Sequence, residues 1–163
     1  MLLLVIRHAI AVPRGTPGIA DAERPLTPDG EERFRAAAKG LARLVGRPDA
    51  LLSSPWLRAR QTADIAAEAW GTIEAEETDV LAGGTFDAQA RVLDRYPATA
   101  MVAVVGHEPH VSDLLGRLLG SADEDRLTFK KGGTALVDVP GRLREGGRLV
   151  WFLPPKVLRK LAP

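Results

Sequence analysis

The sequence opens with MLLLVIRHA (residues 1–9), in which the apolar run Leu2 to Ile6 is followed directly by Arg7 and His8. An unbroken apolar run with a β-branched end is typical of a strand covered on both faces, as the central strands of parallel sheets are. We therefore predict a central strand that ends near Arg7 and places His8 at the edge of a sheet.

A second strongly apolar run, Met101 to Val105, also leads into a histidine, His107. Gly106 and Pro109 predict a turn before a helix from about Val111 to Leu119. Other segments have weaker strand patterns. These are Ala50 to Leu52, Ile73 to Leu81 and, as a C-terminal hairpin, Ala135 to Val139 with Arg148 to Leu153.

Helices are predicted between these strands. Thr27-Pro28 supplies an N-cap followed by proline at the first helical position, and apolar residues then recur at helical spacing as far as Val45. Ser54-Pro55 repeats this signature before a helix from about Trp56 to Trp70, and Phe86 to Tyr96 is a further helix.

Strands that alternate with helices predict an α/β fold. We expect a single three-layer α/β/α domain over residues 1–163, with a mostly parallel central sheet and a C-terminal edge hairpin, because 163 residues can bury one core but hardly two. The segment Ala11 to Pro25, rich in proline and glycine, is predicted as a long loop. Loops of this length in small domains are usually functional.

The composition excludes several functions. Basic and acidic residues nearly balance, to a formal charge of +1, so no broad basic face for nucleic acid is expected. The absence of cysteine removes disulfides, thiolate metal sites and a cysteine nucleophile. The apolar start is too short for a secretory signal or a membrane span. We expect a cytoplasmic monomer that binds neither nucleic acid nor membranes.

Polar residues follow three of the predicted strands. His8 follows the first, the segment Ser53 to Arg58 follows the second, and His107 follows the fourth. Because loops at the carboxyl ends of parallel strands share one edge of a sheet, we expect Arg7, His8, Arg58 and His107 to converge there, with Arg60 as a further candidate.

This set of side chains favours a phosphoryl ligand, because guanidinium forks match phosphate oxygens and a helix N-terminus adds N–H donors. A histidine can accept a phosphoryl group if one ring nitrogen is unprotonated while the other is held by a hydrogen bond, commonly to a backbone carbonyl. We therefore interpret His8 as the nucleophile, with Arg7, Arg58 and His107 stabilising charge, and with no metal or cofactor.

Two other motifs have less specific meanings. His107-Glu108-Pro109-His110 lacks the spacing of the zinc-protease helix and is interrupted by proline, which disfavours a metal site. Lys130-Lys131-Gly132-Gly133 could supply cations to an acidic substrate, but it is also typical of a solvated turn and is left out of the catalytic set.

With these residues in place, the sequence resembles the histidine phosphatase superfamily, which includes the phosphoglycerate mutases, and within it the small bacterial SixA-type phosphohistidine phosphatases. The resemblance spans nearly the whole chain. It rests on Arg7-His8, Arg24-Pro25-Leu26-Thr27 with Gly30, Ser53-Ser54-Pro55 with Arg58, Ala59, Gln61, Thr62 and Ala63, Val105-Gly106-His107, and Phe129 to Gly133. It implies that His8 is phosphorylated, that Arg7 and Arg58 bind the phosphoryl group and that His107 completes the pocket.

Two departures from the family pattern bear on the substrate. Ala9 stands where the commonest signature has glycine, and the stretch Val80 to Gly84 lacks the glutamate that acts as acid in mutases and many phosphatases. Without an acid an alcohol leaves poorly, so the sequence favours phosphohistidine on a protein. The alternatives are a small phosphorylated substrate, hydrolysed or isomerised on the same fold, and an inactive phosphate-binding module. Glu76, Glu77 and Glu108 remain candidates for the acid.

Overall fold

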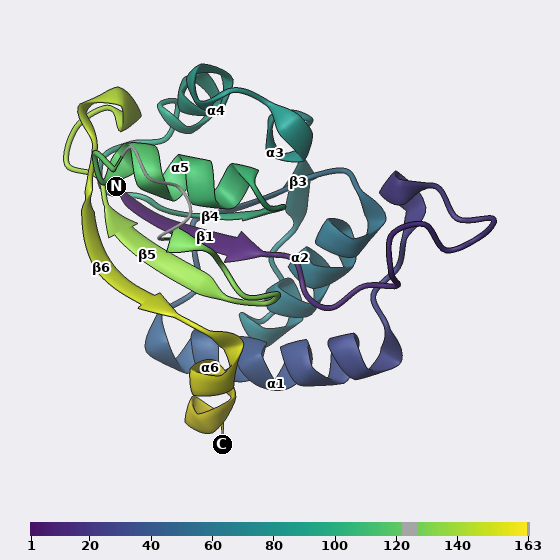
Figure 1. Ribbon diagram of the computed structural model, residues 1–163. Helices are drawn as coiled ribbons and strands as arrows, with labels where there is room; N and C mark the ends of the chain where they lie inside the picture. Colours follow the sequence, from purple (N-terminus) through teal and green to yellow (C-terminus); the bar gives the residue numbers. More distant parts are fainter. Residues whose placement is uncertain (122–126, 163) are drawn as a thin grey trace.

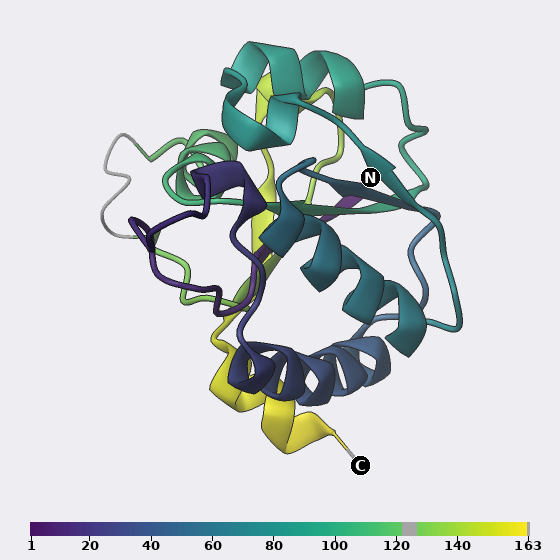
Figure 2. The ribbon, with the colours of Figure 1, turned by 90° about the vertical axis from the view of Figure 1, so that its right-hand side faces the viewer.

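The computed structural model describes residues 1–121 and 127–162. Its sheet has six strands in the order β3-β2-β4-β1-β5-β6, with helices on both faces (Figures 1 and 2). The strands are β1 (Leu2–Arg7), β2 (Ala50–Ser53), β3 (Ala75–Glu77), β4 (Met101–Gly106), β5 (Thr134–Asp138) and β6 (Arg148–Leu153). The first four pair in parallel, whereas β5 and β6 run antiparallel to their neighbours, so the predicted mostly parallel α/β sheet with a C-terminal edge hairpin is confirmed.

The first strand is central and covered on both sides, as its apolar run predicts. Leu4 and Ile6 pack on the side of α1 (Pro28–Leu44) and α2 (Leu57–Ala69). Leu3 and Val5 pack on the opposite side, against α5 (His110–Leu118) and α4 (Phe86–Leu93). All four side chains are fully buried, and the alternation of successive residues between two cores fixes the strand in the middle layer.

The first helix begins where its capping signature predicts. The hydroxyl of Thr27 accepts a hydrogen bond from the Gly30 N–H at 3.0 Å, and Pro28 occupies the first helical position. At Gly30 a Cβ atom would lie 2.1 Å from the carbonyl oxygen of Ile10, so only glycine lets the start of α1 approach the loop after β1. This close approach places the loop next to the site described below.

The second helix begins within one residue of its predicted start, but its predicted cap was wrong. Ser54 does not cap α2, because its own N–H still donates to the Val105 carbonyl at 3.0 Å as an extension of the sheet. The chain turns only afterwards, so Trp56 is the N-cap residue and the helix begins at Leu57. The Ser54 hydroxyl accepts the Trp56 N–H at 3.3 Å and keeps its own proton for a partner elsewhere.

The strand predicted over Ile73 to Leu81 was also too long. Only Ala75–Glu77 pair with β2, because that strand offers just three residues, Leu51 to Ser53, to β3. The chain then turns into the short helix α3 (Val80–Gly83), which buries Leu81 in the core beside α5. The helix expected to reach Tyr96 ends at Leu93.

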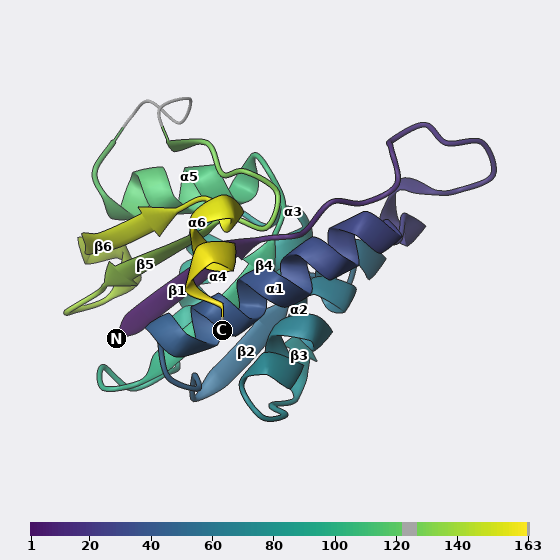
Figure 3. The ribbon, with the colours of Figure 1, turned by 90° about the horizontal axis from the view of Figure 1, so that it is seen from below.

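A C-terminal helix, α6 (Pro155–Leu161), was not predicted. It packs against α1, on the same face of the sheet as that helix (Figure 3). Gly40 of α1 makes the contact possible, since a Cβ there would lie 1.9 Å from the carbonyl oxygen of Leu158. A helix of seven residues has too short an apolar pattern to stand out in a sequence, and it depends on this packing. The described residues include no helix that is both long enough and apolar enough to span a bilayer.

Candidate active site

Two neighbouring strand ends bring the two histidines together. Arg7 of β1 lies in register with Gly106 of β4, so His8 and His107 are the next residues of adjacent parallel strands. The His8 N–H donates to the Gly106 carbonyl at 3.0 Å, and the two imidazole centroids are 5.0 Å apart. Both side chains are buried, with exposed fractions of 6% and 3%.

The tautomer of His8 is fixed by the residue that follows it. Nδ1 lies 2.7 Å from the carbonyl oxygen of Ala9, and a carbonyl can only accept, so Nδ1 carries the ring proton. Nε2 then has a lone pair, which accepts from Nε of Arg58 at 3.2 Å. Burial lowers the pKa of His8 to about 3, opposed by the hydrogen bond to Ala9 and assisted by His107 and the nearby arginines. The imidazole is therefore neutral at pH 7.

Arg58 reaches His8 from the first turn of α2. Its side chain is almost fully buried, with its guanidinium 4.7 Å from the ring centroid of Trp56. Nη1 donates to the Asp21 carbonyl at 2.6 Å. Burial, and then the charge of Arg24, lower the pKa of Arg58 to about 10, so the group still carries its charge at pH 7. A buried cation with its Nε on the imidazole nitrogen is well placed to hold an anion there.

His107 is held differently from His8. Its Nε2 lies 2.7 Å from the hydroxyl of Ser54, and its ring lies 4.8 Å from that of Trp56. The Ser54 hydroxyl accepts the Trp56 N–H at 3.3 Å, and its own proton is available for donation to Nε2. That arrangement puts the ring proton of His107 on Nδ1, a buried atom without a hydrogen-bond partner among the described residues. Burial, and then the charge of Arg58, lower its pKa to about 3.

Arg7 is anchored through its guanidinium end. Nη1 donates to the Phe129 carbonyl, while Nε is buried and has no partner among the residues that the structure describes. The Phe129 N–H donates in turn to Oε1 of Glu108 at 2.7 Å, and Ser112 donates to the same oxygen. Burial lowers the pKa of Arg7 and the charge of Glu108 opposes this. The side chain is thus positioned with its buried Nε–H unused.

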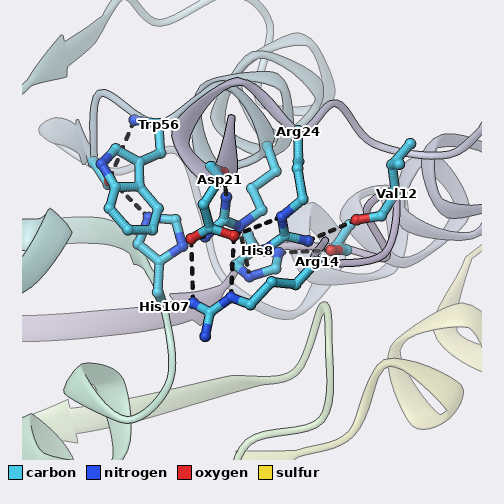
Figure 4. A network of polar contacts seen from close by, with 10 residues as sticks. His8, Val12, Arg14, Asp21, Arg24, Trp56 and His107 are labelled. Atoms are coloured by element: carbon cyan, nitrogen blue, oxygen red, sulfur yellow. Dashed lines mark hydrogen bonds and ion pairs between the residues drawn. The ribbon is translucent and has the colours of Figure 1, made fainter. Parts of the chain in front are cut away.

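The predicted loop between β1 and α1 lies over this cluster and contributes charges that sequence reasoning missed. Asp21 accepts from Arg14 at two distances of 3.2 Å and from Arg24 at 2.8 Å, and lies 3.7 Å from Arg58. Figure 4 shows its carboxylate between these guanidinium groups, beside His8. The hydrogen bond from Arg14, and then that from Arg24, lower the pKa of Asp21 to about 2 against the effect of burial. For Arg14 and Asp21 the length of the loop was the only signal, whereas Arg24 belongs to the motif Arg24-Pro25-Leu26-Thr27.

The remaining motif residues hold the loops that carry the site. The Thr62 hydroxyl donates to the Arg58 carbonyl at 2.6 Å and accepts the Ala9 N–H at 3.0 Å, which ties α2 to the segment after His8. Gln61 accepts the Leu26 N–H at 2.7 Å through its side-chain oxygen. Ala9 lies outside the left-handed region of backbone space, so the usual glycine is not needed there.

Several other candidates lie outside the cluster. Arg60 is half exposed and pairs with Glu77 at 2.7 Å. Glu76 is exposed on the edge strand β3, and Glu108 is committed to Phe129 and Ser112. The three carboxylates considered as the acid are therefore not brought to the His8 ring. The structure does bring together His8, His107 and Arg58, with Arg7 close enough for its charge to lower the pKa of His8.

This chain belongs to the histidine phosphatase superfamily, branch 1, whose family model matches residues 3–89. It is also similar to an uncharacterised protein of Picosynechococcus sp., with 35% identity over 136 residues that cover 82% of each chain.

Within the superfamily the chain is similar to SixA. A structure of the protein histidine phosphatase SixA complexed with tungstate has 25% identity and a TM-score of 0.84, over 97% of this chain and 99% of that one. A candidate phosphohistidine phosphatase SixA from Agrobacterium tumefaciens has 26% identity and a TM-score of 0.78, over 94% and 97% of the two chains. Family and structural likeness together support a phosphatase, a hydrolase of phosphoryl groups.

Proposed function

We propose that this chain hydrolyses phosphohistidine on a protein through a phosphoryl intermediate on His8. The observation that carries the proposal is the state of the His8 ring. Its Nδ1–H is held by the Ala9 carbonyl, its pKa is about 3, and its Nε2 lone pair lies against Arg58. This is an uncharged nucleophile beside a fixed cation, without the need for a separate base.

In the first step, Nε2 of His8 attacks phosphorus, forming a new N–P bond as the N–P bond to the substrate imidazole breaks. The electron pair of that bond stays on the departing ring. In the second step, a water oxygen attacks phosphorus, the bond to Nε2 breaks, and phosphate leaves while the water proton passes to solvent. His8 regains its lone pair, and Nδ1 keeps its proton throughout.

Three N–H groups support binding of the transferred group. The Nε–H of Arg7 and the ring N–H of His107 are buried without partners in the described residues, and Arg58 is a buried cation at Nε2 of His8. A phosphoryl oxygen would give these donors acceptors and spread the charge of the transition state. The groups that perform this work are all side chains, so the proposal requires no metal ion.

The protonation states of the site residues favour an imidazole as the leaving group. Both site histidines have pKa values of about 3 and Asp21 one of about 2, so none of them holds an acidic proton at pH 7. An alcohol would leave poorly here, because its oxygen needs a proton as the bond breaks. A phosphorylated imidazole has a second ring nitrogen that can carry a proton beforehand, so it departs as a neutral ring without a donor.

Turnover of a histidine-phosphorylated peptide, compared with p-nitrophenyl phosphate and 3-phosphoglycerate, tests the substrate. We expect a clear preference for the peptide, undiminished by a chelator such as EDTA. A preference for the monoesters would reject the protein substrate.

The intermediate is tested separately. After incubation with phosphoramidate, an acid-labile and alkali-stable adduct should appear on His8 by mass spectrometry and be absent from His8→Asn. Phosphate binding without any adduct would identify a binding module instead of an enzyme.

A further inference from the structure

A hollow of about 360 Å³ lies beside the active site, outside the machinery described above. Its wall includes Ala9, the residue after His8, and Gly132, whose N–H donates to the carbonyls of both Arg7 and His8. The hollow therefore shares its backbone wall with the proposed nucleophile. A polypeptide that binds with its phosphoryl group at His8 can therefore place a neighbouring segment in the hollow.

The floor of the hollow is apolar. Phe34 of α1 is buried at its base, and Ile10, Pro154 and Pro155 complete the surface. A smaller hollow of about 90 Å³ adjoins it through Pro154 and extends the floor to Phe152. The larger hollow, here called the α1–α6 groove, is lined at one end by Ala9 beside the active site and at the other by Lys156 and Arg159 of α6.

Glycine keeps the groove open. Gly132 has a φ of +77°, a conformation that side chains rarely adopt, and a Cβ there would lie 3.1 Å from Phe34 and 3.6 Å from Pro155. A larger residue would fill the space between these two side chains. The Gly132-Gly133 pair thus does more than turn the chain after Lys131.

The rim of the groove is cationic. It carries five basic side chains from three separate segments: Arg33, Lys130, Lys131, Lys156 and Arg159. Of these, only Arg33 has an ion pair with a described residue, an exposed contact with Asp29 within α1. The whole chain has a formal charge of only +1, so this concentration of cations is local and lacks compensating carboxylates along the groove lining.

The shape and chemistry favour a polypeptide over a small molecule. Pockets for small ligands orient them with a few convergent polar groups, whereas the polar groups here are long cations at the rim around an apolar floor. An apolar centre with a charged rim is the anatomy of a protein interface. We propose that the α1–α6 groove docks an acidic segment of the phosphohistidine-bearing protein, with one aliphatic side chain on Phe34 and carboxylates on the rim. This rests on the proposed function, because the docked protein is the substrate.

Binding is tested apart from catalysis with fluorescent peptides that carry no phosphoryl group. One has an aliphatic residue flanked by glutamates (Glu-Glu-Leu-Glu-Glu), a second has glutamine in place of each glutamate, and a third has glycine in place of leucine. By fluorescence anisotropy the first should bind at least about tenfold more tightly than either of the others. Equal binding of the leucine and glycine peptides would show charge attraction without docking and overturn the proposal.

A matched pair of double variants locates the site. Lys131→Glu/Lys156→Glu reverses two rim charges, and Lys39→Glu/Lys160→Glu makes the same change on exposed positions outside the lining. Only the first should weaken the acidic peptide, by about tenfold, and the difference should shrink between about 50 mM and about 500 mM salt. Equal loss in both variants would mean a general effect of net charge and contradict the proposal.

Turnover connects docking to the reaction. With the acidic peptide extended to include a phosphohistidine, the rim variant should raise KM about tenfold and leave kcat, and the hydrolysis of free phosphoramidate, within about twofold. A parallel loss on phosphoramidate would place the lysines in the catalytic site and reject docking. Should the wild type bind the acidic peptide but hydrolyse only monoesters, the proposed function fails, and with it the identity of the docked segment as substrate.

Discussion

The carboxyl ends of β1 and β4 each present a buried histidine at the same level of the sheet, and each has a pKa lowered to about 3 mainly by burial. The partners of the rings differ. His8 uses Nδ1 for the carbonyl of its own neighbour, whereas His107 uses Nε2 for Ser54, the residue that follows β2. The second nitrogen is therefore Nε2 in His8, where it faces Arg58, and Nδ1 in His107, where it has no partner among the described residues.

Residue type and burial therefore do not by themselves make a histidine a nucleophile. The nitrogen that is left free decides the role, and so does the group that faces it. At His8 the free nitrogen has a lone pair against a buried arginine, which suits attack on phosphorus. At His107 the arrangement with Ser54 leaves an N–H, which suits donation to a phosphoryl oxygen.

Removal of the proposed nucleophile should lower the rate more than any other substitution in the site. His8→Ala is expected to lower kcat by at least ~10⁴-fold, because it deletes the atom that forms the covalent bond, while His107→Ala lowers it by ~10²–10³-fold as the loss of one donor. Rates with phosphoramidate, beside circular dichroism to confirm folding, measure both. Equal losses in two folded variants would mean that the histidines share one role.

Substitution of Arg58, the buried arginine at Nε2 of His8, should have the next largest effect on the rate. Arg58→Lys should reduce kcat/KM by ~10²–10³-fold, since lysine keeps the charge but loses the fixed fork that holds an anion against His8. Arg60→Lys is the matched control two residues along the same helix, where the side chain is half exposed and pairs with Glu77, and it should change the rate less than about twofold. A similar loss in both would show that the helix, and not the contact with His8, matters.

Loss of the Ser54 hydroxyl, which contacts His107 but not His8, should have a smaller effect on kcat. Ser54→Ala removes the hydroxyl from Nε2 of His107 and frees that ring to change tautomer, for an expected loss of about tenfold in kcat. Ser53→Ala, whose hydroxyl donates to the Ser54 carbonyl instead of an imidazole, is the control. Rescue of the rate by Ser54→Thr would assign the effect to the hydroxyl, whereas unaltered activity in Ser54→Ala would remove Ser54 from the site.

The pH profile should be nearly flat where an ordinary histidine would titrate. The His8 pKa is lowered to about 3, so the free enzyme keeps its lone pair, and kcat/KM should change less than about threefold between pH 7 and pH 5 on this account. An acid limb near pH 6.5 in a folded protein would contradict the buried neutral ring.

The free energy of unfolding, in contrast, should depend on pH in this range. The unfolded histidines bind protons below about pH 6.5 while the folded ones do not, so the free energy of unfolding should fall as pH drops from there toward pH 3. His107→Gln should make this fall shallower in urea titrations.

Much of the fold follows from local pattern. The two apolar runs that became β1 and β4 bury alternate side chains in two cores, and the Thr27-Pro28 signature starts α1 as expected. Patterns failed where the outcome depends on a distant partner. The short β2 limits the length of β3, and α6 forms against a glycine of α1 more than a hundred residues earlier in the chain.

Local hydrophobic periodicity is enough to predict which residues stand at the strand ends, and the shared edge of parallel strands predicts that they meet. Three-dimensional packing sets which partner each imidazole nitrogen faces, brings Ser54 to His107 and places Asp21 among three arginines. Hydrogen bonds and desolvation act through space over a few ångströms, between residues that are dozens of positions apart. A one-dimensional pattern contains no record of those distances.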